Sequence, residues 1–274
     1  MDIYESVTRF YESAKGEKTE IGKTLFGHTM YALKVGSGSP VGLVQYALHG
    51  REFITAKLAF EQYKVGVKKG SCWFLPLMNP DGALLSEIGL YSVEKEGNRT
   101  RLLALNGGNR DFSGWKANGR GVDLNVNFPA RWGKGVKNVR TAGAENYIGE
   151  KPFSEAETLA LGLFTKKVRP DYTVSYHTKG EEIYWYFQQS LHTCPRDKGL
   201  AVVLSQATGY PLAYAQGSAG GYKDWCIKKF GIPAFTIEAG ADTFSHPLGE
   251  SALADMINKN QTAIYELSGA WSEL

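Results

Sequence analysis

Two side chains that suit a divalent metal ion stand three positions apart early in the chain. His49 and Glu52 follow the apolar run Val41 to Ala47, and the sequence from Thr55 onward has the pattern of a helix. In open α/β sheets, ligands bind in the crevice beyond the carboxyl ends of the strands, which is where this pair is expected to lie. A neutral imidazole and a carboxylate together suit zinc. The pair alone does not make a site, so a third ligand and a catalytic group must come from elsewhere.

A third ligand is available at the end of another predicted strand. The chain has five histidines, and His177 directly follows the β-rich run Asp171 to Tyr176. A lone histidine is more often structural than a ligand, but the strand-end position favours His177. Three protein ligands with an open position for water are typical of a catalytic zinc site. Glu238 closes the apolar run 232–237 and is either a base for the activated water or a carboxylate paired in the core.

The segments that must position these residues alternate between strand and helix patterns. Strands are expected at about 41–48, 71–77, 171–176, 183–188, 211–215 and 232–237, with a hairpin strand within 23–35. Helices are expected at about 2–15, 55–64, 154–167, 195–208, 221–229 and 250–267. Ser154 and Glu157 have the spacing of a capping box, and 79–82 has the composition of a turn. This alternation predicts one α/β domain over residues 1–274, with a mixed, mostly parallel central sheet and helices on both faces.

Residues 89–150 have weak apolar periodicity and are rich in Gly, Asn, Arg, Lys and Ser. A long irregular segment in a compact domain is usually functional or disordered. Because this one contains the motif Gly-Val-Asp-Leu-Asn at 121–125, we interpret it as functional.

The composition excludes several classes of protein. A net charge of +3, from 31 basic and 28 acidic residues, is too balanced to indicate nucleic-acid binding. The three cysteines form no CxxC pair, so neither a disulfide framework nor a thiolate metal site is expected. The sequence has no signal-peptide pattern and no apolar run long enough to cross a membrane, which predicts a cytoplasmic protein. It carries no signal for an oligomeric state.

The order of the motifs resembles that of the zinc carboxypeptidases of the funnelin type, over nearly the whole chain. The shared elements are His-x-x-Glu at 49–52, Gly-Val-Asp-Leu-Asn at 121–125, Ser-x-His at 175–177, Gly-Gly-x-x-Asp-Trp at 220–225 and Thr-x-Glu at 236–238. The resemblance implies that one zinc ion is held by His49, Glu52 and His177. It further implies that Glu238 activates water and later protonates the leaving amine.

The resemblance also implies roles around the substrate. Arg120 corresponds to the arginine that polarises the scissile carbonyl, with Arg110 as the fallback, and Asn125 to the asparagine that binds a terminal carboxylate. An arginine that normally follows this asparagine is replaced by Val126, so a plain carboxypeptidase activity is in doubt. Arg131, Arg110 and Lys116 lie near the irregular segment and are candidates to replace it.

A mobile-loop tyrosine of the digestive members is replaced here by Gln216. Tyr214 or Tyr222 is a candidate substitute for it.

The helix start Gly-Gly-Tyr-Lys-Asp-Trp most resembles the bacterial peptidases that cleave γ-D-glutamyl–diaminopimelate bonds in murein peptides. Lys223 stands at the side-chain specificity position, where it would receive a carboxylate, and Asp224 would orient the backbone or an amine. The expected substrate is therefore a murein peptide containing meso-diaminopimelate. A carboxypeptidase or deglutamylase that acts on peptide tails, and a non-catalytic zinc- or peptide-binding homologue, are the alternatives.

Overall fold

The structure is a computed structural model of the chain and describes residues 1–271. Within these residues, eight strands form one sheet. The strands are β1 (Lys18–Lys23), β2 (Thr29–Gly36), β3 (Val41–Tyr46), β4 (Ser71–Leu75), β5 (Tyr172–His177), β6 (Glu182–Tyr184), β7 (Leu212–Ala213) and β8 (Ala234–Glu238). The α-helices are α1 (Ile3–Ser13), α2 (Thr55–Val65), α3 (Pro80–Ile88), α4 (Glu96–Leu105), α5 (Ala156–Val168), α6 (Cys194–Thr208), α7 (Tyr222–Phe230), α8 (Glu250–Asn260) and α9 (Ala263–Ala270). Short 3₁₀ helices are η1 (Gly50–Glu52), η2 (Gly89–Ser92) and η3 (Leu124–Val126).

The sheet has a parallel centre and mixed edges. Its strand order is β1-β2-β4-β3-β5-β8-β6-β7. Strands β4, β3, β5 and β8 run parallel, whereas β2 pairs antiparallel with β4 and β6 pairs antiparallel with β8. Every residue of β4 and β5 is buried, as expected for parallel strands that are covered on both faces. The predicted α/β fold with a mixed central sheet is confirmed.

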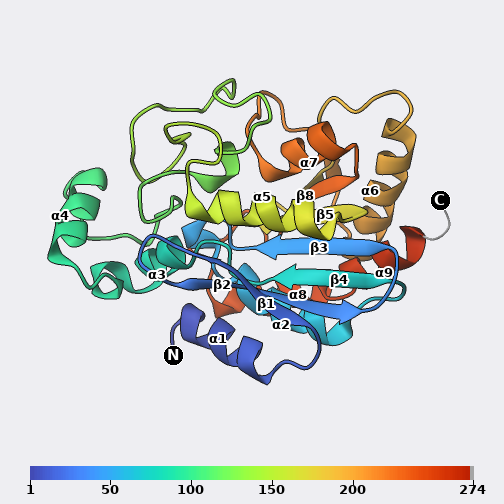
Figure 1. The fold of residues 1–274 in the computed structure, drawn as a ribbon, viewed down its shortest axis with the longest axis horizontal. Coiled ribbons are helices and arrows are strands. Elements are labelled where there is room, and N and C mark those ends of the chain that lie inside the picture. The colour runs from blue at the N-terminus through green and yellow to red at the C-terminus, as the bar shows by residue number, and fades with distance from the viewer. Residues whose placement is uncertain (272–274) are drawn as a thin grey trace.

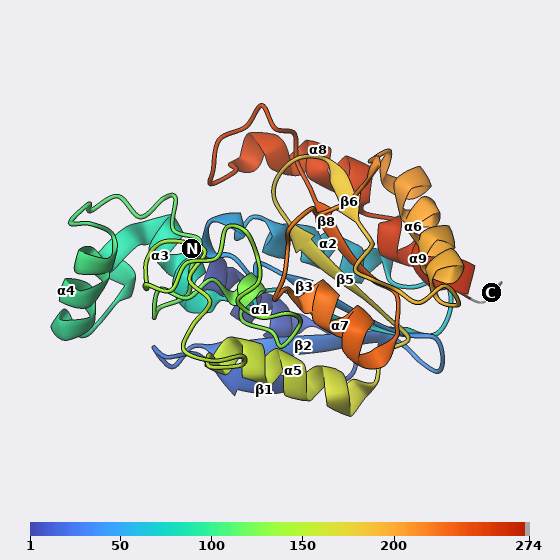
Figure 2. The same ribbon diagram turned by 90° about the horizontal axis from the view of Figure 1, so that it is seen from above.

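Helices cover the two faces of the sheet in separate layers. Helices α5 and α7 lie on one face, and α2, α6, α8 and α9 lie on the other (Figures 1 and 2). Successive side chains of a strand point to opposite faces, so Leu43 packs in the cluster with α5 and α7 while Val44 packs with the other layer. Within residues 1–271, no helix is both long enough and apolar enough to cross a membrane.

Two predictions about helix starts differ from the structure. The expected turn at 79–82 is the start of α3, because the Asn79 side chain accepts from the Gly82 N–H at 2.9 Å and caps the helix. Ser154 does not cap α5, which begins at Ala156. Its hydroxyl instead donates to the Glu155 carboxylate at 2.7 Å.

The irregular segment contains a helix that was not predicted, and the predicted C-terminal helix is divided into two. Helix α4 lies within 89–150, at the far end of the molecule from α6 (Figure 2). The expected helix over 250–267 is two helices, α8 and α9, because the chain turns at residues 261–262.

Candidate active site

Three of the predicted functional residues lie at the ends of neighbouring parallel strands or just beyond them. His49 follows β3, His177 is the last residue of β5, and Glu238 is the last residue of β8. Strand β5 lies between β3 and β8, and His177 is paired in register with Glu238. Because parallel strands end at the same edge of a sheet, side chains that are far apart in sequence meet there.

The side chains of His49, Glu52 and His177 converge through nitrogen and oxygen atoms. The two Nδ1 atoms are 3.1 Å apart, and Glu52 places one carboxylate oxygen 2.9 Å from the Nδ1 of His49 and the other 2.8 Å from that of His177. All three side chains are buried, and their ligand atoms lie within 4.8 Å of one another. Two imidazoles and a carboxylate are a ligand set that fits a catalytic zinc ion, so His49, Glu52 and His177 could hold one.

The turn that carries the first two ligands requires a glycine. A Cβ added at Gly50 would lie 2.4 Å from the carbonyl oxygen of Gly82 and 2.7 Å from that of Trp115. The Gly50 N–H donates to the Lys116 carbonyl at 2.9 Å. The metal-binding turn is thus packed directly against the start of α3 and against the irregular segment.

Asp123 contacts His49 on the ring nitrogen that does not face Glu52. One of its carboxylate oxygens is 3.1 Å from the Nε2 of His49, and the other is 2.8 Å from the Nζ of Lys116. Burial would raise the pKa of Asp123, but Lys116 and His49 hold this pKa well below its usual range. A carboxylate on the outer nitrogen of a metal-binding imidazole fixes its tautomer and its orientation.

Glu238 lines the cavity beside the metal-binding residues. Burial raises the pKa of its carboxyl to about 7, and Glu52 adds to this effect while His177 and Lys116 oppose it. A pKa near neutrality is typical of a group that both accepts and returns a proton.

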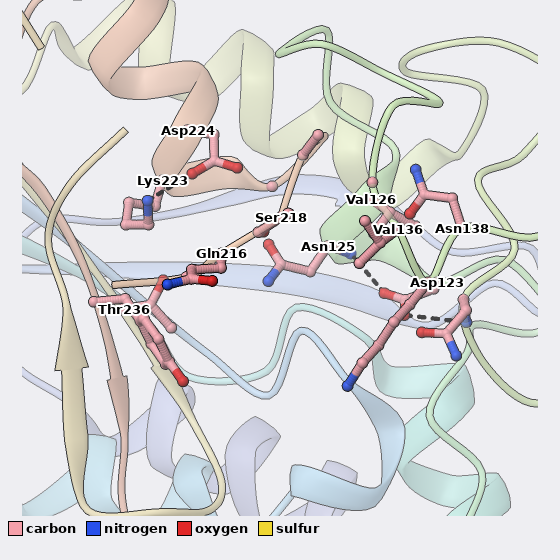
Figure 3. Close-up of a pocket in the computed structure, with 18 of the residues that line it drawn as sticks. Asp123, Asn125, Val126, Val136, Asn138, Gln216, Ser218, Lys223, Asp224 and Thr236 are labelled. Atoms are coloured by element: carbon pink, nitrogen blue, oxygen red, sulfur yellow. Dashed lines mark hydrogen bonds and ion pairs between the residues drawn. The ribbon is translucent and has the colours of Figure 1, made fainter. Parts of the chain in front are cut away.

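The cavity has a volume of about 380 Å³ and opens at the carboxyl ends of the strands (Figure 3). It is lined by His49, Lys116, Asp123, Asn125, Val126, Gly135, Val136, Lys137, Asn138, Asn146, Tyr184, Tyr214, Ala215, Gln216, Gly217, Ser218, Ala219, Gly221, Lys223, Asp224, Thr236 and Glu238. Polar and charged side chains predominate, which suits a charged, hydrogen-bonding ligand better than an apolar one.

Lys223 and Asp224 form a buried ion pair at the first turn of α7. The Lys223 Nζ donates to Asp224 Oδ1 at 2.6 Å and to the Tyr186 carbonyl at 3.1 Å. An ammonium has three donors, so one remains for a ligand. Asp224 Oδ2 is buried and has no hydrogen-bond partner among the described residues. The pair therefore offers one donor and one acceptor to a ligand.

The other predicted substrate-binding residues separate into two groups. Asn125 and Gln216 line the cavity, and Asn125 Oδ1 accepts from the Tyr222 N–H at 3.1 Å, which leaves its amide nitrogen to donate. Tyr222 does not line the cavity. Its side chain is buried in the core and its hydroxyl lies 2.8 Å from that of Thr165, because it faces inward from α7. Tyr214 is 60% exposed and lines the cavity instead.

The structure does not bring the predicted arginine to the cavity. The Arg120 side chain is 45% exposed, and its guanidinium lies 3.4 Å from Glu150 and 3.7 Å from Glu155. Arg110 lines a different hollow, between α3 and α4. The cation beside the metal-binding residues is Lys116.

The contacts that link Lys116, Asp123 and His49 were not predicted from the sequence, which indicated Lys116 only as a candidate to replace the missing arginine. Asp123 stands inside the motif at 121–125 and caps η3 by accepting from the Asn125 N–H. Its place between two apolar residues, Val122 and Leu124, was the available signal for a buried carboxylate that needs partners.

Comparison with known proteins places these residues in a family context. A family model described as zinc carboxypeptidase matches residues 12–263. The chain is 30% identical over 251 residues to gamma-D-glutamyl-L-diamino acid endopeptidase 1 of Lysinibacillus sphaericus, covering 85% of this chain and 62% of the relative. It is 35% identical over 122 residues to murein peptide amidase A of Escherichia coli K12, covering 41% of this chain and 47% of the relative. The chain spans less than two thirds of the length of the first relatives it matches.

Solved structures share the fold. Bovine thrombin-activatable fibrinolysis inhibitor superposes with a TM-score of 0.78 at 19% identity, covering 100% of this chain and 97% of that one. The murein-tripeptide amidase of Escherichia coli O157 superposes with a TM-score of 0.60 at 25% identity, covering 91% of this chain and 94% of that one.

Proposed function

The chain belongs to the zinc carboxypeptidase family of hydrolases, and on that premise we propose that it cleaves murein peptides. The bond we propose joins the γ-carboxyl of D-glutamate to meso-diaminopimelate. The relatives named for gamma-D-glutamyl-diamino acid and murein peptide substrates support this choice. The observation that carries it is a buried Lys223–Asp224 pair in the cavity that His49 and Glu238 also line.

His49, Glu52 and His177 would hold the zinc ion. Bound zinc supplies Lewis-acid chemistry, which polarises a carbonyl and makes a water molecule more acidic. Glu238 then takes a proton from the attacking water and delivers it to the departing nitrogen. Its carboxylate is restored when the amide bond has been replaced by an acid and an amine.

Lys116 is our candidate for the cation that stabilises the developing oxyanion. Its ammonium lines the cavity and is positioned by the 2.8 Å contact with Asp123, whose other oxygen contacts His49. A fixed positive charge aimed at the scissile carbonyl stabilises the transition state more than the substrate. In this proposal Lys116 takes the role that the resemblance to the family implies for Arg120.

The Lys223–Asp224 pair fits the distal end of diaminopimelate, which carries one ammonium and one carboxylate. Lys223 has a remaining N–H for the carboxylate, and the unpartnered Asp224 oxygen can accept from the ammonium. Charge-assisted hydrogen bonds of this kind are strong and specific. A glutamate side chain would use Lys223 but leave the Oδ2 atom of Asp224 without a partner, which is why we place a deglutamylase second.

The decisive experiment is mass spectrometry of products formed from L-Ala-γ-D-Glu-meso-diaminopimelate by the zinc-loaded enzyme. We expect free diaminopimelate and the dipeptide. An intact tripeptide, together with glutamate released from a poly-glutamate peptide, would favour the deglutamylase. If neither substrate is cleaved while zinc is bound, the non-catalytic alternative is favoured.

A further inference from the structure

One cation in the cavity wall has no role in the reaction described above. Lys137 lines the cavity with its neighbours Val136 and Asn138, and its side chain is exposed. Resting on the proposed function, we propose that Lys137 binds the main-chain carboxylate of the leaving diaminopimelate. The preferred substrate would then be a peptide that ends at this residue.

The charges along the cavity single out this lysine. Its lining has three lysines, and two of them already contact a carboxylate of the protein. Lys116 lies 2.8 Å from Asp123, and Lys223 lies 2.6 Å from Asp224. Within residues 1–271, Lys137 has no carboxylate at ion-pair distance. A substrate carboxylate would form the ion pair that Lys137 does not make within the protein.

The backbone around Lys137 is held in place on both sides. The Val136 N–H donates to the Gly217 carbonyl at 3.0 Å, and the Val139 N–H donates to the Asn146 carbonyl at 3.0 Å. The lysine is thus carried by a fixed wall, and only its side chain has to move to meet a ligand.

Neighbouring side chains suit a carboxylate that is bound by Lys137. Asn138 Nδ2 is buried and donates to no described residue, and the amide nitrogen of Asn125 is available from the adjoining wall. Val126 lines the cavity between them but has no charge to offer. Among the three lysines of the lining, Lys137 is the one without a carboxylate partner, and it can supply the charge that Val126 lacks.

Lys223 and the segment that carries Lys137 lie on opposite sides of the cavity. Figure 3 shows Lys223 and Asp224 on one side, Val136 and Asn138 on the other, and Asn125 between them. A diamino dicarboxylic acid with both carboxylates free can satisfy both sides at once. If the peptide continued beyond this residue, a neutral amide would replace one carboxylate and Lys137 would lose its partner.

Calorimetric binding to a zinc-loaded, turnover-deficient Glu238→Gln enzyme tests this. The ligands are L-Ala-γ-D-Glu-meso-diaminopimelate and the same peptide with the main-chain carboxylate of diaminopimelate amidated. Adding Lys137→Gln should weaken binding of the acid by about tenfold or more, since bonds to charged groups are worth more than neutral ones. Binding of the amide should change less than about twofold, and Lys137→Arg should restore binding of the acid.

Lys134→Gln is the matched control, because Lys134 is exposed on the same segment and does not line the cavity. It should leave the affinity for both peptides unchanged. Equal losses on both peptides, or no loss in Lys137→Gln, would overturn the assignment to Lys137 and leave the proposed function intact. If the parent enzyme bound neither peptide, the proposed function would fail and this inference with it.

Discussion

Glu238 can serve as a base because it is partly shielded from water but still lines the cavity. It closes β8 directly beside His177, so its carboxylate and the metal-binding residues share one edge of the sheet. The same carboxylate that accepts a proton must later return it. A side chain of equal size that cannot carry a proton is therefore the sharpest test.

Replacing Glu238 by Gln is expected to reduce kcat by at least about a hundredfold while zinc remains bound, since general acid–base catalysis contributes roughly 10²–10⁴. Steady-state kinetics on the cleaved peptide and metal analysis of the same sample check both parts. An unchanged kcat in a sample with one zinc per chain would remove Glu238 from the mechanism.

Replacing Lys116 and replacing Arg120 are expected to change kcat to very different extents. Lys116→Met should lower kcat by about 10²–10³, the loss seen when one oxyanion donor is removed. Arg120→Gln should change it less than about threefold, because this guanidinium lies outside the cavity lining and its carboxylate neighbours, Glu150 and Glu155, do not line the cavity either. Kinetics of the two variants side by side decide between them, and the reverse ranking would reinstate Arg120.

The position of Arg120 outside the cavity lining has a physical cause. His177 and Glu238 each end a strand and His49 follows one closely, so their positions could be predicted from the apolar runs that mark strands. Lys116 and Arg120 lie in the same irregular segment, where no periodicity shows which side chain turns inward. The resemblance to the family pointed to the guanidinium of Arg120, but the path of the loop brings the ammonium of Lys116 to Asp123.

At the scale of elements, the parallel strands were the most predictable part of the fold. Their runs of apolar residues are continuous because both faces are covered, as β4 and β5 show. The start of α5 was less predictable. The hydroxyl of Ser154 donates to the adjacent Glu155 carboxylate instead of capping the helix, and Glu155 itself is held by Asn118.

The start of α5 buries a carboxyl group against other acids. Burial, with Asp81 and Glu155 nearby, raises the pKa of Glu157 from 4.5 to about 8. The folded chain thus keeps a proton that the unfolded chain loses above about pH 4.5. The free energy of unfolding should therefore fall as the pH rises from about 4.5 to 8, with this group contributing at most about 1.4 kcal/mol per pH unit.

Glu157→Gln should remove this contribution. Urea unfolding at pH 5, 6.5 and 8 should show the variant gaining stability relative to the wild type as the pH rises. Glu94→Gln is the control, since Glu94 is exposed, and it should follow the wild-type curve. Parallel curves for Glu157→Gln and the wild type would show that Glu157 does not hold the extra proton.

At the scale of the whole molecule, the central sheet brings His177 next to His49 and Glu52. His49 and Glu52 come from the connection between β3 and α2, and His177 comes from the end of β5, far later in the chain. The unfolded chain has no such arrangement, so zinc should bind the folded state almost exclusively. The free energy of zinc binding therefore adds to the free energy of unfolding.

Zinc is therefore expected to raise the melting temperature of the molecule. At free zinc a thousandfold above Kd, the added stability is about 4.1 kcal/mol. At about 2 °C per kcal/mol for a chain of this size, Tm should rise by roughly 8 °C. Differential scanning calorimetry with EDTA and with added zinc measures the shift. His177→Ala should abolish most of it and Arg120→Gln should preserve it, because only His177 is a predicted ligand. A Tm that is equal with and without zinc in the wild type would mean that these three side chains do not hold the ion.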